Sequence, residues 1–268
     1  MRKYTYENHV IAQPLLPFIF HKEHSVSKRI SSVNWHENIE LLYCIRGSGF
    51  VRCGSADTEF TPGDIFVVNP DIPHSIGSET EVHYRCLIVD NRFLEENGFP
   101  AGALQFQPLI RDPELCLLFD AVTRGYDRIH DGSPYTVAEI RSAVLSLLCR
   151  LCRLYATVGK GDERSDAYVK KVIRYIRQDP SAPITLDELA AYAGFSKYHL
   201  CRQFKAYTGS TVIATINLIR CTQARRLIES GKPVSEAAAA CGYENLSYFT
   251  RVFKKHLHAL PSSFLPGR

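Results

Sequence analysis

Hydrophobic and polar positions follow two different spacings along the chain. Between residues 33 and 89, apolar and aromatic residues form short runs, such as ELLYCIRGSGFVRC and DIFVVNP, which Gly and Pro separate. Short runs rich in Val, Ile, Phe and Tyr, divided by frequent turns, predict the strands of a β-barrel or sandwich. After about residue 112 the spacing becomes helical. One helix is predicted with these residues on a single face: Leu115, Leu118, Phe119, Val122, Tyr126 and Ile129.

A longer helix is predicted from about residue 136 to 156. Its apolar residues recur at alternating steps of four and three: Ile140, Val144, Leu147, Leu151 and Leu154. This spacing is typical of a seam along which two helices pack, and we expect the seam to hold a homodimer together. The alternative is that the helix packs on its own barrel. Cys149 and Cys152 form a C-x-x-C without a second pair, so we interpret them as core or partner-facing residues and not as zinc ligands.

These patterns predict an α+β chain in four segments. They are a barrel at 1–110, a helical dimerisation segment at 111–158, a Gly-rich charged linker at 159–166, and an all-helical region at 167–268.

The last region contains the signals of a helix-turn-helix. Thr185 and Glu188 have the spacing of a capping box, Gly194 can end that helix at positive φ, and Ser196 is a good N-cap for the next helix. The same order recurs, which predicts helix-turn-helix motifs at 185–208 and 234–257.

The second helices of the two motifs repeat one arrangement of faces. A helical wheel places Leu200 and Phe204 inward in the first copy, and Leu246, Phe249 and Phe253 inward in the second. The outward positions, with two flanking residues, are Lys197, Tyr198, Cys201, Arg202 and Lys205, and then Asn245, Ser247, Thr250, Arg251 and Lys254. Arg can bond guanine with two donors and Lys can contact phosphate, so these faces predict contacts with double-stranded DNA. The alternative is a pair of solvated helix faces.

Charge and spacing support the same interpretation. The chain carries a net +4, but the part from Asp166 onward holds 15 basic and seven acidic residues. A basic C-terminal region favours a polyanion as partner. Between the two motifs, TVIATINLIRCTQARRLIES predicts a helix of about 20 residues and so roughly 30 Å, close to one turn of DNA.

The C-terminal hundred residues resemble the AraC/XylS family of bacterial transcription regulators. The resemblance lies in LDELAAYAGFSKYHLCRQFKAYTG, in R-x-x-x-A-R-R-L from Arg220 to Leu227, and in GYENLSYFTRVFKKHLHALPSSF. It implies a cytoplasmic, sequence-specific regulator controlled by a small-molecule effector, with RNA polymerase as a further partner. The chain departs from the family at Val212, His258 and Leu265, which affects the capping of the last helices and not the DNA-facing positions.

The N-terminal region resembles the cupin-like barrel of the sugar-responsive branch of that family. The matching positions are Asn34-Trp35-His36, Glu40, Gly47, TPGD at 61–64, and His74. The resemblance implies a cup for a small molecule, and a carbohydrate is the class we expect. The expected ligand contacts are His36, Glu40, His74 and Tyr84.

A metal is the competing interpretation of the same residues. His36, Glu40 and His74 are chemically suited to a divalent ion. Asn34 stands where cupins have a further histidine, so we expect no metal and no other cofactor. A third alternative is that the three residues only satisfy one another's hydrogen bonds.

Other features of the sequence bound the function. Nine cysteines are scattered without a framework, and neither a membrane-length apolar stretch nor an export signal is recognised, so a cytoplasmic protein without membrane contact is expected. We expect the protein not to be an enzyme. The alternatives are a metal-dependent cupin enzyme with a DNA-binding tail, and an architectural protein that bends DNA without an effector.

Overall fold

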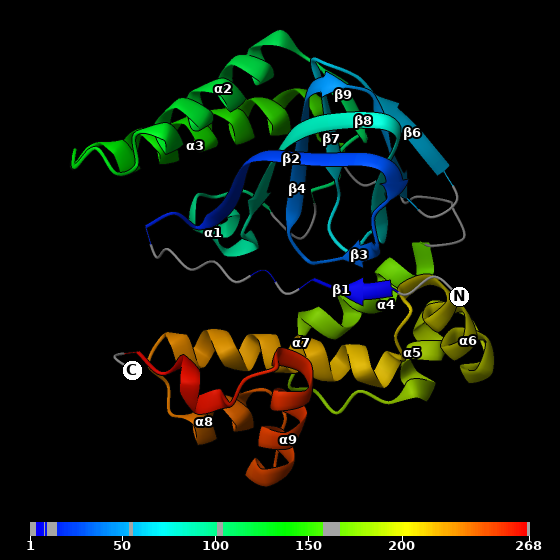
Figure 1. Ribbon diagram of the computed structural model, residues 1–268. Coiled ribbons are helices and arrows are strands. Elements are labelled where there is room, and N and C mark those ends of the chain that lie inside the picture. The colour runs from blue at the N-terminus through cyan, green and yellow to red at the C-terminus, as the bar shows by residue number, and fades with distance from the viewer. Residues whose placement is uncertain are drawn as a thin grey trace. The chain divides into compact units, whose positions relative to one another are not determined.

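The structure is a computed structural model that describes residues 4–7, 9, 15–53, 56–100, 104–157 and 167–266. The predicted linker at 159–166 lies outside the described residues. The chain divides into two compact units, Met1–Gly161 and Asp162–Arg268. The first is built on a β-sheet and the second from helices (Figure 1), which confirms the predicted α+β class.

The first unit contains one large sheet and its covering helices. In the described residues its strands are β1 (Tyr4–Tyr6), β2 (Phe18–Ile30), β3 (Val33–Trp35), β4 (Ile39–Gly47), β5 (Gly49–Cys53), β6 (Ala56–Phe60), β7 (Asp64–Val68), β8 (His74–Val89) and β9 (Leu109–Arg111). Its helices are α1 (Asn91–Glu96), α2 (Pro113–Asp127) and α3 (Thr136–Tyr155). The prediction placed the first strand near residue 33 and missed β2, because most of that strand is polar and exposed.

Strand β8 organises the sheet. It pairs antiparallel with β2 along residues 77–89, with β4 along its C-terminal half, and with β5 at its N-terminal end. The register sets Glu40 opposite Ile88, Leu42 opposite Cys86, and Cys44 opposite Tyr84. Because side chains alternate along a strand, Glu40 and Cys86 point to the same face of the sheet.

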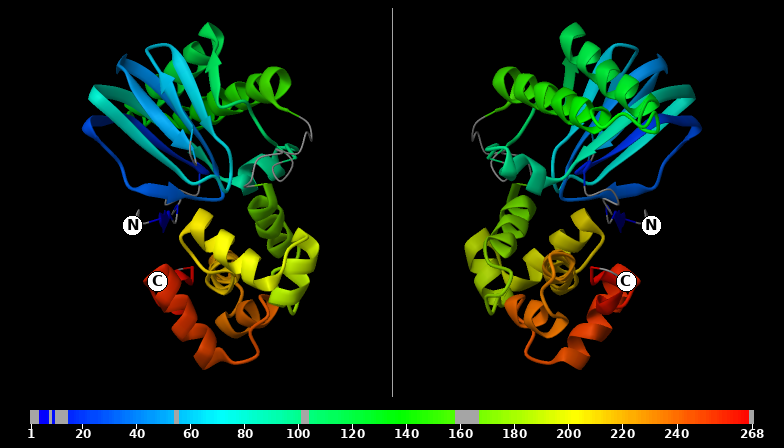
Figure 2. Two further views of the ribbon diagram at one scale, coloured as in Figure 1. Left: turned by 90° about the vertical axis from the view of Figure 1, so that its right-hand side faces the viewer. Right: turned by 90° about the vertical axis from the view of Figure 1, so that its left-hand side faces the viewer.

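The sheet separates two apolar clusters. One lies inside the barrel, and its largest members include Phe60 and Phe66. The other lies on the outer face of the sheet, where α2 and α3 cover it side by side (Figure 2). The Asp112 side chain caps the N-terminus of α2 and accepts hydrogen bonds from Arg150 and Tyr155 of α3, which fixes the two helices to each other.

The predicted dimerisation seam packs within the chain. Ile140, Val144, Leu147 and Leu151 are at most 1% exposed in the outer cluster, and only Leu154 is exposed, at 53%. The prediction that this stripe faces a second chain is therefore wrong for four of its five residues. The alternative interpretation, in which the helix packs on its own barrel, accounts for the seam. A helix that packs on a sheet buries one apolar stripe, just as a helix that packs on a partner helix does.

All the regular secondary structure in the described residues of the second unit is helical. Its elements are α4 (Ala167–Gln178), α5 (Leu186–Ala193), α6 (Lys197–Thr208), α7 (Val212–Glu229), α8 (Val234–Ala240), α9 (Leu246–Leu257) and the 3₁₀ helix η2 (Pro261–Phe264). The predicted capping box is present at the start of α5, and Gly194 ends that helix with φ of 77°. No described helix of either unit has the length and hydropathy that a bilayer crossing requires.

The turn between α8 and α9 depends on glycine. Gly242 has φ of 76°, and a Cβ placed there would lie 2.7 Å from the Ser181 carbonyl oxygen. Arg220 of α7 donates to the carbonyls of Pro180 and Ala182 in the same region, at 2.7 and 2.8 Å. The turn before α9 and the Arg220 side chain of α7 therefore both pack against the segment that precedes α5.

Candidate nucleic-acid interface and ligand site

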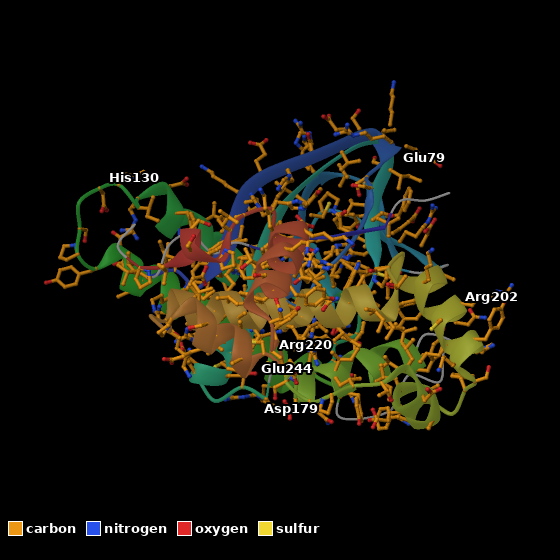
Figure 3. All side chains as sticks on the ribbon, turned by 90° about the horizontal axis from the view of Figure 1, so that it is seen from below. Glu79, His130, Asp179, Arg202, Arg220 and Glu244 are labelled. Atoms are coloured by element: carbon orange, nitrogen blue, oxygen red, sulfur yellow. The ribbon has the colours of Figure 1, made fainter. Side chains whose placement is uncertain are left out.

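Helix α6 presents a cationic face that the unit does not cover. The Ser196 side chain caps the helix, while Leu200 and Phe204 are fully buried against the rest of the unit. On the opposite side Tyr198 is 76% exposed, and Arg202 is exposed with its side chain pointing away from the helices (Figure 3). Lys205 is exposed and Cys201 is half-buried beside them. The predicted inward and outward faces of this helix are both present.

Helix α9 repeats the arrangement. Phe249 and Phe253 are fully buried, whereas Ser247, Arg251 and Lys254 are exposed. The Arg251 guanidinium carbon lies 5.9 Å from the centre of the Tyr248 ring. This contact holds the Arg251 side chain along its own helix and leaves it in solvent, where a base edge could meet it.

Three predicted positions have local roles in the structure. Asn245 is the N-cap of α9, and its side chain accepts a hydrogen bond of 2.8 Å from the Tyr248 amide. Lys197 forms an ion pair of 2.8 Å with Asp187 of α5. The Thr250 hydroxyl donates to the Leu246 carbonyl, 2.9 Å away. Each of these three side chains has a partner within the second unit. Contacts with DNA are therefore expected mainly from the other predicted residues of α6 and α9.

One inward position was predicted wrongly. Leu246 was expected inward with Phe249 and Phe253, but it is 46% exposed. It is the first residue of α9 and corresponds in register to Lys197, the first residue of α6. The first turn of this helix projects beyond the core that the following turns contact, and a helical wheel contains no information on where that core ends.

The exposed face of α6 borders a hollow in the surface of the second unit. Leu186, Val212 and Ile213 supply its apolar side, with Thr211 next to them. The side that belongs to α6 consists of Tyr198, Cys201, Arg202 and Lys205. An apolar floor with a cationic rim suits a sugar-phosphate backbone or a base methyl group.

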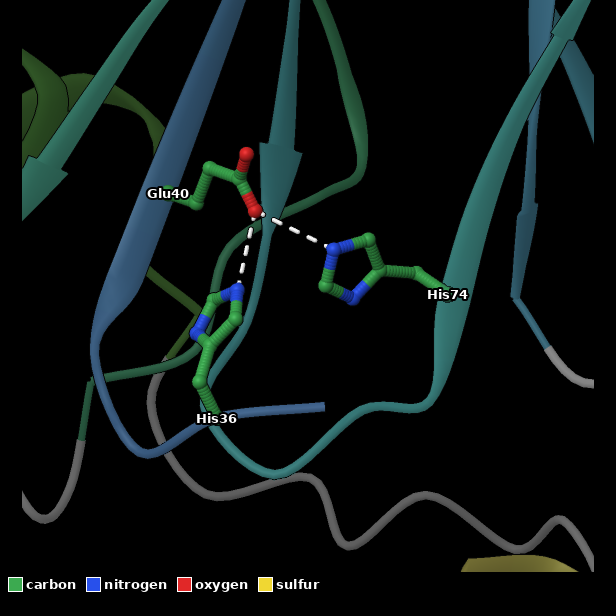
Figure 4. Close-up of side chains that lie close together, drawn as sticks. All are labelled: His36, Glu40 and His74. Atoms are coloured by element: carbon green, nitrogen blue, oxygen red, sulfur yellow. Dashed lines mark hydrogen bonds and ion pairs between the residues drawn. The ribbon is translucent and has the colours of Figure 1, made fainter. Parts of the chain in front are cut away.

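The other predicted site lies at one end of the barrel. The Glu40 Oε2 atom lies 2.9 Å from His36 Nε2 and 3.1 Å from His74 Nε2 (Figure 4). His36 follows β3, Glu40 is in β4, and His74 begins β8, so three strand ends bring them together. All three are buried, with at most 7% of each residue exposed.

Each member of this group has a second partner. His36 Nδ1 lies 2.9 Å from the Asn38 carbonyl oxygen, and His74 Nδ1 lies 3.0 Å from that of Ile72. The Cys86 thiol donates to Glu40 Oε1 over 3.1 Å. The one N or O ligand atom that each residue offers lies within 4.8 Å of the other two. The three side chains therefore form a hydrogen-bonded cluster, and their polar atoms are not free for a ligand in an open pocket.

Burial and mutual contact set the charges of the cluster. Burial acts to raise the pKa of Glu40, but the hydrogen bonds and charges of His36 and His74 outweigh it and hold the pKa well below its ordinary value. Burial lowers the pKa of His36. Burial also acts to lower the pKa of His74, yet the bond to Glu40 reverses the effect and raises it. These effects favour an ionised Glu40, and they make His74 hold a proton more readily than His36 does.

The remaining predicted ligand residue lies apart from this cluster. Tyr84 points into the barrel and stacks on His24 with ring centroids 5.6 Å apart. It is two residues along β8 from Cys86, or roughly 7 Å, and its ring contacts are with His24 and Phe60. Asn34 donates to Glu7 over 3.2 Å. The structure brings His36, Glu40 and His74 together, and does not bring Tyr84 to them.

Two neighbours of the cluster were missed from the sequence. Cys86 alternates with Tyr84 on β8, so the period of two could have placed it inside the barrel. His9 lies against His36, with ring centroids 4.4 Å apart, and its side chain is 5% exposed. His9 belongs to the segment before the barrel, where no sequence pattern indicated a contact with this cluster.

Two family profiles match the chain, and they match the two units separately. Residues 20–146 match the profile described as AraC-like ligand binding domain, and residues 189–266 match one described as Helix-turn-helix domain. The first profile contains the buried cluster, and the second contains both exposed cationic faces. The chain belongs to the AraC family of transcriptional regulators. The resemblance stated from the sequence is confirmed.

Curated relatives agree with this membership, and a solved structure is similar over most of the chain. The MmsAB operon regulatory protein of Pseudomonas aeruginosa is 27% identical over 96% of this chain and 84% of its own length. The HTH-type transcriptional activator RhaR of Klebsiella pneumoniae is 24% identical over 85% of each chain. The crystal structure of ToxT from Vibrio cholerae O395 is 14% identical, covers 94% of this chain and 99% of its own, and has a TM-score of 0.44. This AraC-family chain thus combines a ligand-binding domain with a DNA-binding domain, and its relatives are regulators.

Proposed function

We propose that this AraC-family regulator reads DNA by placing α6 and α9 in successive major grooves of one duplex. The observation that carries the proposal is the repetition of exposed Arg and Lys at matched positions, Arg202 with Arg251 and Lys205 with Lys254. The 18 residues of α7, which lies between the two helices in the chain, span roughly 27 Å. That length is close to one turn of DNA, so each helix would meet its own groove segment.

The test is selection of binding sites from random duplex DNA by the full chain, followed by footprinting. We expect two short blocks of preferred bases about one helical turn apart. Uniform binding to all sequences would instead indicate an architectural protein, since phosphate contacts alone carry no base preference.

The effector is proposed to bind inside the N-terminal domain and to change the affinity for DNA. A carbohydrate or related metabolite is the class proposed, because histidine and carboxylate groups bond hydroxyls well. The two oxygens of Glu40 already have partners, so a sugar would have to displace His36, His74 or Cys86. A thermal-shift screen of mono- and disaccharides, followed by DNA binding with each hit, tests this class. Hits that stabilise the chain without changing DNA affinity would remove the coupling.

A homodimer is proposed to form through the exposed surfaces of α2 and α3. The support is that Leu117 and Leu154 are 62% and 53% exposed on helices whose other faces are already buried. Sedimentation of the full chain and of Leu117→Lys and Leu154→Lys tests this surface. Dimers that persist in both variants would point to another interface.

The proposed site of action is the cytoplasm, where the DNA of a bacterial cell lies. Contact with RNA polymerase at a promoter is proposed as the means of control. In vitro transcription from a selected binding site, with and without this protein, distinguishes control of RNA polymerase from binding alone.

A further inference from the structure

We propose that His36, Glu40 and His74 form a binding site for one divalent transition-metal ion. Three potential ligand atoms converge at the end of the barrel. Glu40 Oε2 lies 2.9 and 3.1 Å from the Nε2 atoms of His36 and His74. An ionised carboxylate oxygen and the unprotonated nitrogen of a neutral imidazole each carry a lone pair. That lone pair can accept a hydrogen bond or bind a metal ion.

The backbone determines which ring nitrogens carry hydrogen. A carbonyl oxygen can only accept, so the Nδ1 atoms that face Asn38 and Ile72 must each donate. In a neutral imidazole this leaves Nε2 with a lone pair, and both lone pairs then point at a carboxylate oxygen. Three acceptors in contact within a buried space repel one another unless a proton on one histidine or a metal ion lies among them. A metal ion bound to all three removes this conflict.

The outer partners of the cluster are those that metal sites use. Histidine ligands commonly donate their second ring nitrogen to a backbone carbonyl, and a ligating carboxylate is itself hydrogen-bonded. Here His36 and His74 have the carbonyl partners, and Cys86 donates to the Glu40 oxygen that faces away from the histidines. These bonds orient all three ligand atoms toward one point without using the metal.

The distances leave room for an ion after a small adjustment. Zinc binds histidine nitrogen and carboxylate oxygen at roughly 2.0–2.2 Å, so two ligand atoms on a tetrahedral ion lie about 3.4 Å apart. The two Glu40 contacts are shorter than this by half an ångström or less, and all three ligand atoms lie within 4.8 Å of one another. Two imidazoles and one carboxylate favour zinc, cobalt, nickel, copper or ferrous iron over calcium and magnesium, which prefer oxygen ligands.

The site has three protein ligands and no contribution from Asn34. The Asn34 amide is bonded to Glu7 and its position in β3 pairs with the first residue of β8. A three-ligand ion keeps at least one coordination position for an outside molecule. The inference replaces the expectation of a chain without a cofactor, and it concerns the ligand-binding domain alone, so it does not depend on the proposed mode of reading DNA.

Cobalt titration of the full chain, produced without a histidine tag and treated with a chelator, tests the site. We expect one equivalent of Co²⁺ per chain, seen as visible absorption bands that Zn²⁺ then displaces. Glu40→Gln and His74→Asn each remove a ligand and are expected to weaken binding at least about 100-fold. Cys86→Ala removes only an outer partner and is expected to weaken it about 10-fold, and Cys86→Ser is expected to restore most of the loss.

His83→Asn is the matched control. His83 lies on β8, as His74 does, but its ring faces Glu81 and Arg46 outside the cluster. It should bind Co²⁺ like the unchanged chain. Failure of the unchanged chain to take up one equivalent at neutral pH would overturn the proposal even if the ligand variants do not fold. Equal binding by folded Glu40→Gln or His74→Asn would overturn it as well.

DNA affinity is measured on the same samples to keep the two proposals apart. A chain that binds its DNA site but takes up no Co²⁺ contradicts the metal site and leaves the mode of DNA binding intact. A chain that takes up Co²⁺ but prefers no DNA sequence contradicts only the proposed mode of DNA binding.

Discussion

Arg202 and Arg251 occupy the same place in two different helices. Each is the sixth residue of its helix, each follows a buried residue by two positions, and both side chains are exposed. The residues around them differ, with Tyr198 and Cys201 in α6 replaced by Ser247 and Thr250 in α9. Two helices with one scaffold and different surroundings would prefer different bases.

Arg251→Ala is expected to weaken binding to the selected DNA site by roughly 1–3 kcal/mol and to relax the base preference at one position. The reason is the loss of a two-donor contact that only guanine accepts well. Binding titrations on the selected site and on single-base variants measure both effects. Arg153→Ala, an exposed arginine on α3, is the charge-matched control and should leave affinity unchanged. Equal weakening on every sequence would make Arg251 a phosphate contact.

Lys254→Ala is expected to act on the salt dependence of binding. Lysine contacts phosphate as a point charge, so the variant should lose affinity on all sequences alike and keep the base preference. The slope of log affinity against log salt concentration should fall by about one. An unchanged slope would show that Lys254 does not approach the DNA backbone.

Arg220→Met is expected to destabilise the second unit and leave the first alone. The variant removes donors to the Pro180 and Ala182 carbonyls and should lower the free energy of unfolding by roughly 1–3 kcal/mol. Trp35, the sole tryptophan, lies buried in the first unit, so its fluorescence follows that unit, while far-UV circular dichroism is dominated by helix. The dichroism transition in urea should shift, and the fluorescence transition should not. Arg202→Met, an exposed site, should shift neither.

Asp112→Asn tests the contact between α2 and α3 and gives a pH dependence. The hydrogen bond from Arg150 holds the pKa of Asp112 below its ordinary 3.8. Its ionised form therefore stabilises the folded unit above that value, and the stabilisation is lost as the pH falls through the lower folded pKa. Against the variant, the unchanged chain should be more stable by roughly 1–3 kcal/mol near neutral pH, and the gap should close below about pH 4. Urea unfolding followed by Trp35 fluorescence measures it; a gap that widens in acid would contradict this account.

Local signals in the sequence predicted the helical unit well. Thr185, Glu188, Gly194 and Ser196 act on residues three or four positions away, so their spacing alone specified where α5 ends and α6 begins. The barrel was harder. Strand β2 escaped prediction because its exposed polar residues carry no apolar alternation.

The remaining errors of prediction concern which partner a helix face or a strand face packs against. The period of Ile140 to Leu151 correctly predicted an apolar stripe, but the same period suits a sheet or a second chain. The resemblance to the cupin-like barrel predicted that His36, Glu40 and His74 line one site. The contacts of Cys86 and His9 with them depend on pairing across the sheet and on a segment that precedes it. Contacts between residues distant in sequence are set by the whole fold, and no single pattern contains them.

The central claim is that α6 and α9 each read their own stretch of one duplex. Site selection with Arg202→Ala and with Arg251→Ala, beside the unchanged chain, tests it most directly. The account predicts that each variant loses preference at a different position, and that the two positions lie about 10 base pairs apart, one turn of the helix. Loss at the same position in both variants, or no loss in one of them, would contradict it.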